Sequence, residues 1–519
     1  MKAPVTPTRA ASFSRGDGSN NAKPNTSNRL FVTVLISLVC LVFGGLFLNK
    51  SSCLFGTSTD IATIHDKKNL KHRSSTGGAA VVADATSGRL FKMQKVREIP
   101  TSLHQFQTGS ESKNKNKNIS WPKGPLWSHP ECRHWGVVTT IFDPSQAVKK
   151  FVQDTQAHEG WCLVVSGDHK GPLAYDTTSS PTQPEIKNVV FLAAEHQREL
   201  AQHIPFVGLM PWNHFARKNV AYLYAIANNA ETIFDFDDDN ELITDWIFRL
   251  VDLHHPSGGA TTTAAIAVNA SLPVVDETCQ AINPYPIYKP NTQELIWPRG
   301  YPLENINRKE CTVETTSPIQ MAVDQVGVYQ MMANGDPDVD AIYRQTRTIP
   351  VFFEPVNEER TPILLAPHKQ FFPFNAQATL WKRQAFWGLL LPITVHGRVS
   401  DIWRSYVVQT IFRFLNCHAA YLGPHVRQDR NAHTYLADFD AEKPLYDRAG
   451  ALIHFLLDWK PTRFGGNQMT ATSLLEDLLI DLVEHDILQL EDLTNTQEWL
   501  HTLHALGYSM PSLSGPTAI

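Results

Sequence analysis

Four aspartates crowd the end of an apolar stretch in "AETIFDFDDDNEL", at positions 235, 237, 238 and 239. Carboxylates at this spacing repel one another and lose solvation where the end of a strand is covered, so we expect a positive partner beside them. Hard divalent ions take carboxylate oxygens as ligands and keep open positions for a diphosphate. The pattern therefore predicts a metal–diphosphate site that uses one or two of these carboxylates, and the alternative is an acidic loop in solvent.

Two other families of acidic motif fit less well. In an EF-hand loop that starts at Asp235, the required glycine would be Asn240 and the closing glutamate would be Trp246. Phosphatases of the haloacid-dehalogenase type normally have Thr or Val where this chain has Asp239, and their motif normally opens the fold. Both comparisons disfavour these motifs and leave the Asp-x-Asp metal site.

The elements that must position the cluster read as strand–helix units. Apolar runs predict strands in "WGVVTTIF", "WCLVVSGD", "NVVFLA" and "ETIFDFD", and helical spacing is found in "SQAVKKFVQDTQAHEG" and "HFARKNVAYLYAIANNA". Such alternation predicts a largely parallel sheet with ligands at the carboxyl ends of its strands. Beyond about Ala376 the pattern becomes helical, and the leucines of "TSLLEDLLIDLVEHDIL" are predicted to be packing surface.

The composition is that of a globular protein with a sizeable core. The chain has 519 residues, of which 42% are hydrophobic and 19% charged, and its formal net charge is -5. We found no basic stripe laced with aromatic residues, which argues against nucleic acid as the main partner.

An uncharged stretch near the N-terminus predicts a membrane anchor. Residues 30–48 are roughly long enough to span a bilayer core of about 30 Å. The basic tail before them predicts a cytosolic N-terminus and a lumenal remainder, and we favour an uncleaved signal anchor over a cleaved signal peptide. The predicted organisation is a cytosolic tail (1–29), one transmembrane helix (30–48), a polar stem (49–130) and a lumenal domain (131–510).

A lumenal domain has consequences for its asparagines and cysteines. Asn118 and Asn269 become candidate glycan acceptors. The six cysteines outside the span show no CxxC or other metal-ligand spacing, which disfavours zinc. Cys279 and Cys311 bracket one loop-rich segment and could pair in an oxidising lumen, although six cysteines permit many connectivities.

Several motifs together resemble a known family. The segment "RKNVAYLYAIANNAETIFDFDDDNEL" resembles the donor site of glycosyltransferases with the GT-A fold, and most closely the STELLO-like family of Golgi membrane proteins. The resemblance continues in "WPRGYPLENI", "GDPDVDAIYR", "GRVSDIWRSY" and "AEKPLYDRAG" and covers most of 135–459. It implies an α/β, Rossmann-type nucleotide-sugar-binding head of GT-A type with a helical C-terminal part, on a single-pass type II Golgi membrane protein.

The resemblance also implies roles for individual residues near the donor. Asp237 and Asp239 would hold Mn²⁺ or Mg²⁺ against the diphosphate of a nucleotide-sugar, with UDP favoured. Thr139 and Asp168 would meet the nucleoside, and for Asp168 a turn aspartate is an equal alternative. Arg217, Lys218 and Asn219 lie at the start of a predicted helix, where the helix dipole disfavours cations. A nearby anion would explain them, so they are candidate contacts of the nucleotide-sugar donor, and the alternative is a solvated face.

Further candidates lie later in the chain. The "RGYP" of "WPRGYPLENI" also resembles a motif of reversibly glycosylated polypeptides, and Arg299 would contact diphosphate or acceptor. Asp401 is a candidate acceptor-activating base, with an acid of the first helical turn as the alternative. His396 is a candidate third metal ligand, and the second Asp-x-Asp, at 438–440, is interpreted as helix capping.

The sequence thus predicts a Golgi glycosyltransferase-like protein that transfers sugar from a nucleotide-sugar to a glycan or protein acceptor. The rival is a non-catalytic factor for the assembly or trafficking of membrane polysaccharide synthase complexes, a role linked to the resembling family in plants. A lumenal phosphohydrolase is disfavoured by the order of its motif. Neither the sugar, the acceptor nor the oligomeric state follows from the sequence.

Overall fold

The computed structural model describes residues 119–177, 188–254, 267–357, 360–430, 434–464 and 469–514, with short pieces between 82 and 99. The predicted cytosolic tail, the predicted anchor and most of the predicted stem lie outside the described residues. None of the helices within these ranges combines the length and the apolar character that a bilayer crossing requires.

An eleven-stranded sheet forms the centre of the described part of the chain. Its order is β5 (Val189–Leu192), β4 (Trp161–Ser166), β3 (His134–Thr139), β6 (Thr232–Asp235), β12 (Thr379–Lys382), β10 (Val326–Gly335), β13 (His418–Gln428), β11 (Leu364–Leu365), β8 (Ala267–Pro273) and β9 (Thr316–Ala322), with β7 (Asn240–Leu242) paired to β13. A separate two-stranded sheet joins β1 (Val82–Ala83) and β2 (Leu90–Phe91).

The direction of the strands brings several carboxyl ends to one edge. β5, β4, β3 and β6 are parallel, as the strand–helix alternation predicted. β12 is antiparallel to both β6 and β10, so β10 runs in the same direction as β6, and β13 is parallel to β10. The ends of β3, β4, β6, β10 and β13 therefore lie along the same side of the sheet, where ligands of α/β sheets bind.

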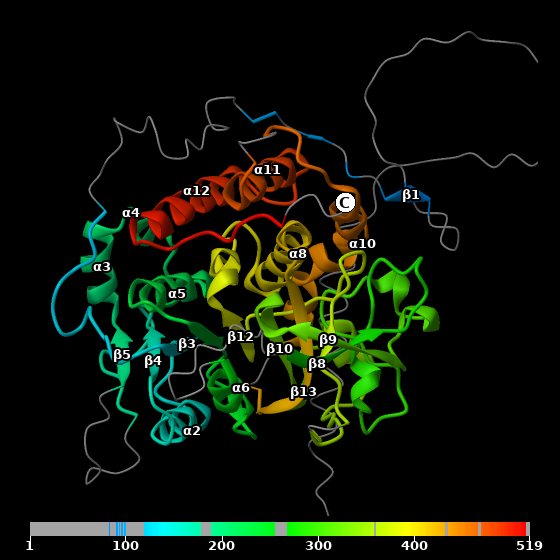
Figure 1. The fold of residues 1–519 in the computed structure, drawn as a ribbon, viewed down its shortest axis with the longest axis horizontal. Helices are drawn as coiled ribbons and strands as arrows, with labels where there is room; N and C mark the ends of the chain where they lie inside the picture. Colours follow the sequence, from blue (N-terminus) through cyan, green and yellow to red (C-terminus); the bar gives the residue numbers. More distant parts are fainter. Residues whose placement is uncertain are drawn as a thin grey trace, which may run out of the picture. The chain divides into compact units, whose positions relative to one another are not determined.

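Helices cover both faces of the sheet (Figure 1). α2 (Gln146–Thr155) and α6 (Trp246–His254) lie on one face, and α5 (Lys218–Ala227) and α8 (Gly397–Leu415) lie on the other. α11 (Ala471–Glu484) and α12 (Leu490–Ala505) form a further layer outside α8. The strands are apolar on both sides because both are covered: β4, for example, is buried over its whole length.

Two hydrophobic cores follow from this layering. Phe151, Phe234 and Phe248 belong to the core beneath α2 and α6, whereas Trp135 and Ile233 belong to the core beneath α5 and α8. Ile233 and Phe234 are neighbours in β6 and fall into different cores because side chains alternate across a strand. The leucines of α11 are buried, which confirms their predicted packing role.

Shorter elements complete the described chain. The remaining helices are α3 (Ala194–His203), α4 (Pro205–Leu209), α7 (Ala341–Thr346), α9 (Tyr435–Ala441) and α10 (Lys443–Asp458), with 3₁₀ turns η2 (Phe215–Arg217), η3 (Tyr285–Tyr288), η4 (Leu303–Asn305), η5 (Lys309–Cys311), η6 (Val323–Gln325) and η7 (Arg383–Leu389).

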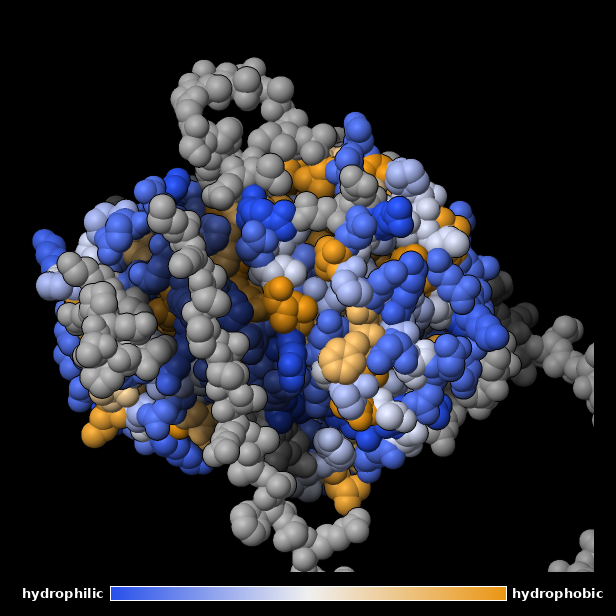
Figure 2. Space-filling view, turned by 90° about the horizontal axis from the view of Figure 1, so that it is seen from below, coloured by the Kyte–Doolittle hydropathy of each residue, from blue (hydrophilic) through white to orange (hydrophobic). Residues whose placement is uncertain are grey.

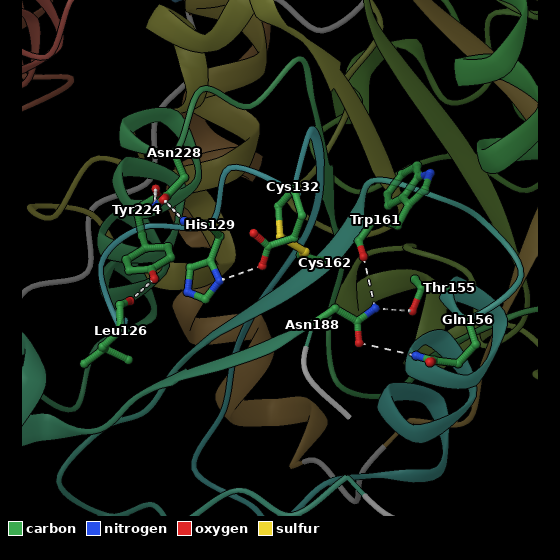
Figure 3. The surroundings of a disulfide bond; sticks show 11 residues. Leu126, His129, Cys132, Thr155, Gln156, Trp161, Cys162, Asn188, Tyr224 and Asn228 are labelled. Carbon is green, nitrogen blue, oxygen red and sulfur yellow. Dashed lines mark hydrogen bonds and ion pairs between the residues drawn. A yellow bond between two sulfur atoms is a disulfide. The ribbon is translucent and has the colours of Figure 1, made fainter. Parts of the chain in front are cut away.

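The chain is packed before the first strand of the large sheet. Trp127 is buried, Trp121 Nε1 donates to its carbonyl oxygen at 2.7 Å, and the Tyr224 hydroxyl of α5 donates to Leu126 O. Trp121, Leu126 and Trp127 lie before residue 130, within the predicted stem, and they pack against α5. The Cys132–Cys162 disulfide then ties the residue just before β3 to β4 (Figure 3).

The predicted pairing of Cys279 with Cys311 is confirmed by a second disulfide. The Cys132–Cys162 disulfide was not predicted, because spacing alone does not show which of the many connectivities a fold uses.

Candidate functional site

The acidic cluster lies at the carboxyl end of β6, and its first member is part of the core. Asp235 is fully buried and accepts a hydrogen bond from the Tyr222 hydroxyl at 2.6 Å. Its carboxylate pairs with Lys218 Nζ at 2.7 Å and with an Arg404 nitrogen at 3.3 Å. Asp235 is therefore balanced by two cations and anchors α5 and α8 to the strand.

Lys218 is the positive partner that the crowding of carboxylates predicted. Its ammonium lies 3.0 Å from Asp237 Oδ1 and 2.7 Å from the carbonyl oxygen of Ala376, in addition to its contact with Asp235. Burial alone would lower the pKa of Lys218, but the charges of Asp235 and Asp237 outweigh it and raise the pKa above its ordinary value. Lys218 is thus a charged, buried link between the core and the exposed part of the cluster.

The remaining aspartates are held by neighbouring loops. The Thr140 hydroxyl donates to Asp238 Oδ2, and the hydroxyl of Ser145, the N-cap residue of α2, donates to the Asp238 carbonyl. Gln428 Nε2 donates to both carboxylate oxygens of Asp239 at 3.2 Å. Burial, together with the charge of Asp237, raises the pKa of Asp239 to about 7.

The cluster carries more negative charge than its described partners neutralise. Asp237, Asp238 and Asp239 have one described ion-pair partner within 4 Å, Lys218, which Asp235 shares. The Asp237 side chain is 33% exposed. Two fixed carboxylates and an excess of negative charge fit a hard divalent cation with open coordination positions. Among the described residues, His129, Glu131 and Cys132 also bring three potential metal-ligand atoms together. The sulfur of Cys132 is bonded to Cys162, so it is not a free thiolate ligand.

The predicted nucleoside contacts take part in local structure. Asp168 is buried and accepts backbone N–H groups of His169 at 2.6 Å, Asn213 at 2.9 Å and His214 at 3.3 Å. The Thr139 hydroxyl donates to Ser166 O at 3.0 Å. These contacts agree with the turn interpretation of Asp168, because its carboxylate organises the loop before α5.

Two of the three polar residues at the start of α5 connect buried elements. Arg217 stacks on the Trp212 ring with its guanidinium carbon 3.8 Å from the centroid and donates to Met210 O at 2.8 Å. Asn219 donates to Leu391 O and accepts from Leu391 N, both at 2.9 Å. Both side chains are buried, so the solvated-face alternative is wrong, and their described contacts give no support to a donor role.

Arg299 and Asp401 are joined in a buried network. Arg299 lies between Asp338 and Asp401, with nitrogen–oxygen distances of 2.8 Å to each. The carboxylate of Asp401 also accepts the N–H groups of Ala376 at 3.2 Å and Ile402 at 2.9 Å.

This network suits a structural role for Asp401 better than a catalytic one. Burial alone would raise its pKa, but the charges of Arg299 and Arg404 lower the pKa below the ordinary value of aspartate. A general base works best when its pKa lies near the working pH and its oxygen reaches the substrate. The geometry therefore gives no support to the predicted base.

His396 and the second Asp-x-Asp also have partners in the structure. His396 is the N-cap residue of α8, and its ring nitrogen accepts the N–H of Arg398 at 3.1 Å. The second Asp-x-Asp falls within α9 rather than at its N-cap, which is Thr434. The capping interpretation is therefore wrong in detail: Asp438 lies in the first turn of α9 and faces Arg430 at 3.7 Å.

Gln428 and Arg430 lie at the end of β13 beside the cluster and were not predicted as site residues. Gln428 holds Asp239, and the charge of Arg430 acts on the same carboxylate. The region after Ala376 was predicted to be helical. The strand β13 was not predicted because its sequence, "HAAYLGPHVRQ", contains Gly-Pro, which is unusual inside a strand. The short apolar run before it, Ala419 to Leu422, was the available signal.

This α/β sheet, covered by helices on both faces and with acids at the carboxyl edge of a strand, is a glycosyltransferase-like fold. Residues 398–518 match the family described as STELLO glycosyltransferases. The chain is 30% identical over 385 residues to the probable glycosyltransferase STELLO2 of Arabidopsis thaliana and 30% identical over 406 residues to STELLO1 of the same plant. These matches cover 73% and 76% of the chain and support the resemblance to a STELLO-like family that its motifs predicted.

The two matches cover 46% and 48% of the relatives, so the chain spans about half the length of the proteins it resembles.

Proposed function

We propose that the chain is a metal-dependent, GT-A-type glycosyltransferase that binds a nucleotide-sugar, with UDP as the favoured nucleotide, at the acidic cluster. The observation that carries the proposal is the excess of carboxylate over cation at Asp237–Asp239, at the carboxyl end of β6. The order of the sheet supports the GT-A assignment, since four parallel strands are followed by the antiparallel β12. Hydrophilic residues line a recess on one face of the molecule (Figure 2).

The division of labour in this proposal follows from the contacts. Asp237 and Asp239 hold Mn²⁺ or Mg²⁺, which when bound neutralises the charge of a departing diphosphate. Lys218 orients Asp237 from inside the core, and Gln428 orients Asp239 from β13. Thr140 and Ser145 both donate hydrogen bonds to Asp238, the residue between the two proposed ligands, and so hold this turn in place. The chain thus preorganises the two ligand carboxylates before any metal binds.

We place the protein in the Golgi membrane as a type II protein with this domain in the lumen, acting on a glycan or protein acceptor. The uncharged stretch at 30–48 and the basic tail before it support the orientation. The two disulfides support an oxidising lumen, because disulfides persist there and are rare in the cytosol.

A second candidate function is that of a ligand-binding assembly factor without turnover. The observation that favours it is the saturation of Asp401 by Arg299 and two backbone N–H groups, which leaves the acceptor-activating base unassigned. A bound nucleotide would stabilise such a factor as it would an enzyme.

Calorimetry with UDP and Mn²⁺ on the full chain tests the proposed site. Wild type should bind UDP only with the metal, and the Asp237→Ala, Asp239→Ala double variant should lose this binding. Asp245→Ala is a matched control, because its side chain is 58% exposed and pairs with Arg249 instead. UDP binding that survives in the double variant would remove the site assignment.

Turnover separates the two candidate functions. A transferase should release UDP from a UDP-sugar in the presence of Mn²⁺, whereas an assembly factor should bind UDP without releasing product.

A further inference from the structure

A surface hollow lies next to the acidic cluster, at the carboxyl ends of β10 and β13. Its volume is about 350 Å³, within the range of ligand sites, roughly 300–1,000 Å³. The residues that matter here are Asp336, Ile349, Pro350, Phe352, Gln428 and Arg430, and we call their cavity the β13 hollow. Gln428 connects the hollow to the cluster, since its Nε2 donates to Asp239 and the residue also lines the hollow.

Two buried polar atoms on residues that line the hollow lack hydrogen-bond partners in the described part of the chain. They are the carbonyl oxygen Oε1 of Gln428 and the Nε of Arg430. The Gln428 residue is 5% exposed and the Arg430 side chain 8% exposed. Because a carboxylate only accepts hydrogen bonds, the amide nitrogen of Gln428 faces Asp239 and its oxygen is left for another group. A buried acceptor and a buried donor, on two residues that line one cavity, both require partners.

The charges of the hollow are already paired. Asp336 forms an ion pair with Arg344, and Arg427 pairs with Asp429 at 2.9 Å on its rim. Arg430 faces Asp438 at 3.7 Å. A ligand that fits this lining is neutral and offers groups that both donate and accept, which is the property of a hydroxyl group.

Phe352 supplies an apolar surface in the same hollow. The residue is 42% exposed, and its backbone is held because its N–H donates to Asn291 Oδ1 at 2.8 Å and its carbonyl accepts the Asn291 N–H at 2.8 Å. An exposed aromatic ring on a held backbone, in the same hollow as residues with unpartnered polar atoms, matches a pyranose, which has C–H groups on one side and hydroxyls at its edge.

We propose that the β13 hollow binds the acceptor, and that the acceptor is a neutral glycan. A sugar that stacks on Phe352 and hydrogen-bonds Gln428 Oε1 and Arg430 Nε would lie one side chain away from Asp239. This assignment rests on the proposed function, because Asp239 belongs to the donor site proposed above.

The test uses the full chain in a detergent without a sugar head group, with two readouts. The first is binding to an array of neutral and sulfated oligosaccharides, and the second is calorimetry with UDP and Mn²⁺. Phe352→Ala should weaken binding to neutral oligosaccharides about tenfold and leave UDP binding unchanged, since stacking on one aromatic ring contributes on that scale. Phe439→Ala is the matched control, because Phe439 is 38% exposed and does not line the hollow.

Gln428→Leu, which removes the unpartnered oxygen, should also weaken glycan binding. The proposal is overturned if wild type captures no neutral oligosaccharide, if it captures only sulfated ones, or if Phe352→Ala and Phe439→Ala behave alike. If wild type does not bind UDP but captures neutral oligosaccharides in a way that depends on Phe352, the donor-site assignment is wrong. The hollow then remains a glycan-binding site.

Discussion

At the scale of single residues, the charged side chains around the acidic cluster fall into two groups. Lys218 and Arg404 neutralise Asp235 inside the core, where an unpaired carboxylate would be costly. Asp239 is oriented by the neutral amide of Gln428, and Asp237 shares the single charge of Lys218 with Asp235, so the charge of these two carboxylates is only partly compensated. The first group makes the strand end stable, and the second leaves it electrically open to a cation.

Lys218→Met is expected to destabilise the protein strongly. The substitution leaves Asp235 buried with one cation fewer and exposes Asp237 to uncompensated repulsion, and breaking a buried pair in this way costs about 3–5 kcal/mol. Lys150→Met is the control, because Lys150 forms a partly exposed pair with Asp154, and such pairs contribute about 0–1 kcal/mol. Denaturant unfolding of both variants checks the difference, and equal losses would contradict the role given to Lys218.

The sequence located the cluster but could not show what each carboxylate faces. A metal site was predicted from an Asp-x-Asp at the end of a strand, a pattern local to a few residues, and the resemblance to a family selected Asp237 and Asp239 as its ligands. Lys218 was predicted to face a donor anion, whereas it faces Asp235 and Asp237. Spacing along α5 and β6 does not determine this contact, because it depends on how the helix packs against the sheet.

At the scale of elements, prediction succeeded where the period is plain. β3, β4, β5 and β6 follow continuous apolar runs, and α11 follows a leucine stripe. β12 has four residues and β13 contains Gly423-Pro424, so neither has a clear strand pattern, and the region was predicted to be helical. Gln428 and Arg430 were missed for this reason.

The approach of the loop at Arg299 to α8 gives a test at this scale. Gly300 has φ +87°, and a Cβ there would collide with Ile402 Cγ2. Gly507 has φ +81° with nothing within 4 Å of the same position. Alanine at either site costs about 1–2 kcal/mol of backbone strain, and at Gly300 the collision adds about 1–3 kcal/mol.

Gly300→Ala should therefore lower the unfolding temperature clearly more than Gly507→Ala, as measured by differential scanning calorimetry. A similar loss in the two variants would show that the loop moves away from α8 at little cost.

At the scale of the whole molecule, covalent links join distant parts of the described chain. Cys132–Cys162 ties the entry to β3 to the neighbouring β4, and Cys279–Cys311 closes the loop-rich segment between β8 and β9. The sequence separations are 30 and 32 residues, so the two links restrict the unfolded chain to a similar degree. The chain-entropy relation gives about 4 kcal/mol for each.

Replacing either pair of cysteines by serine should therefore destabilise the folded chain by a similar amount, about 4 kcal/mol, and dithiothreitol should lower the unfolding temperature of wild type further than that of either variant. Because each variant keeps one link, the reductant still acts on it, and a variant without all four cysteines should not respond. Free thiols in the unreduced protein are counted by alkylation and mass spectrometry. Alkylation at all four of these cysteines would contradict both links and, with them, the support that the disulfides give to a lumenal location.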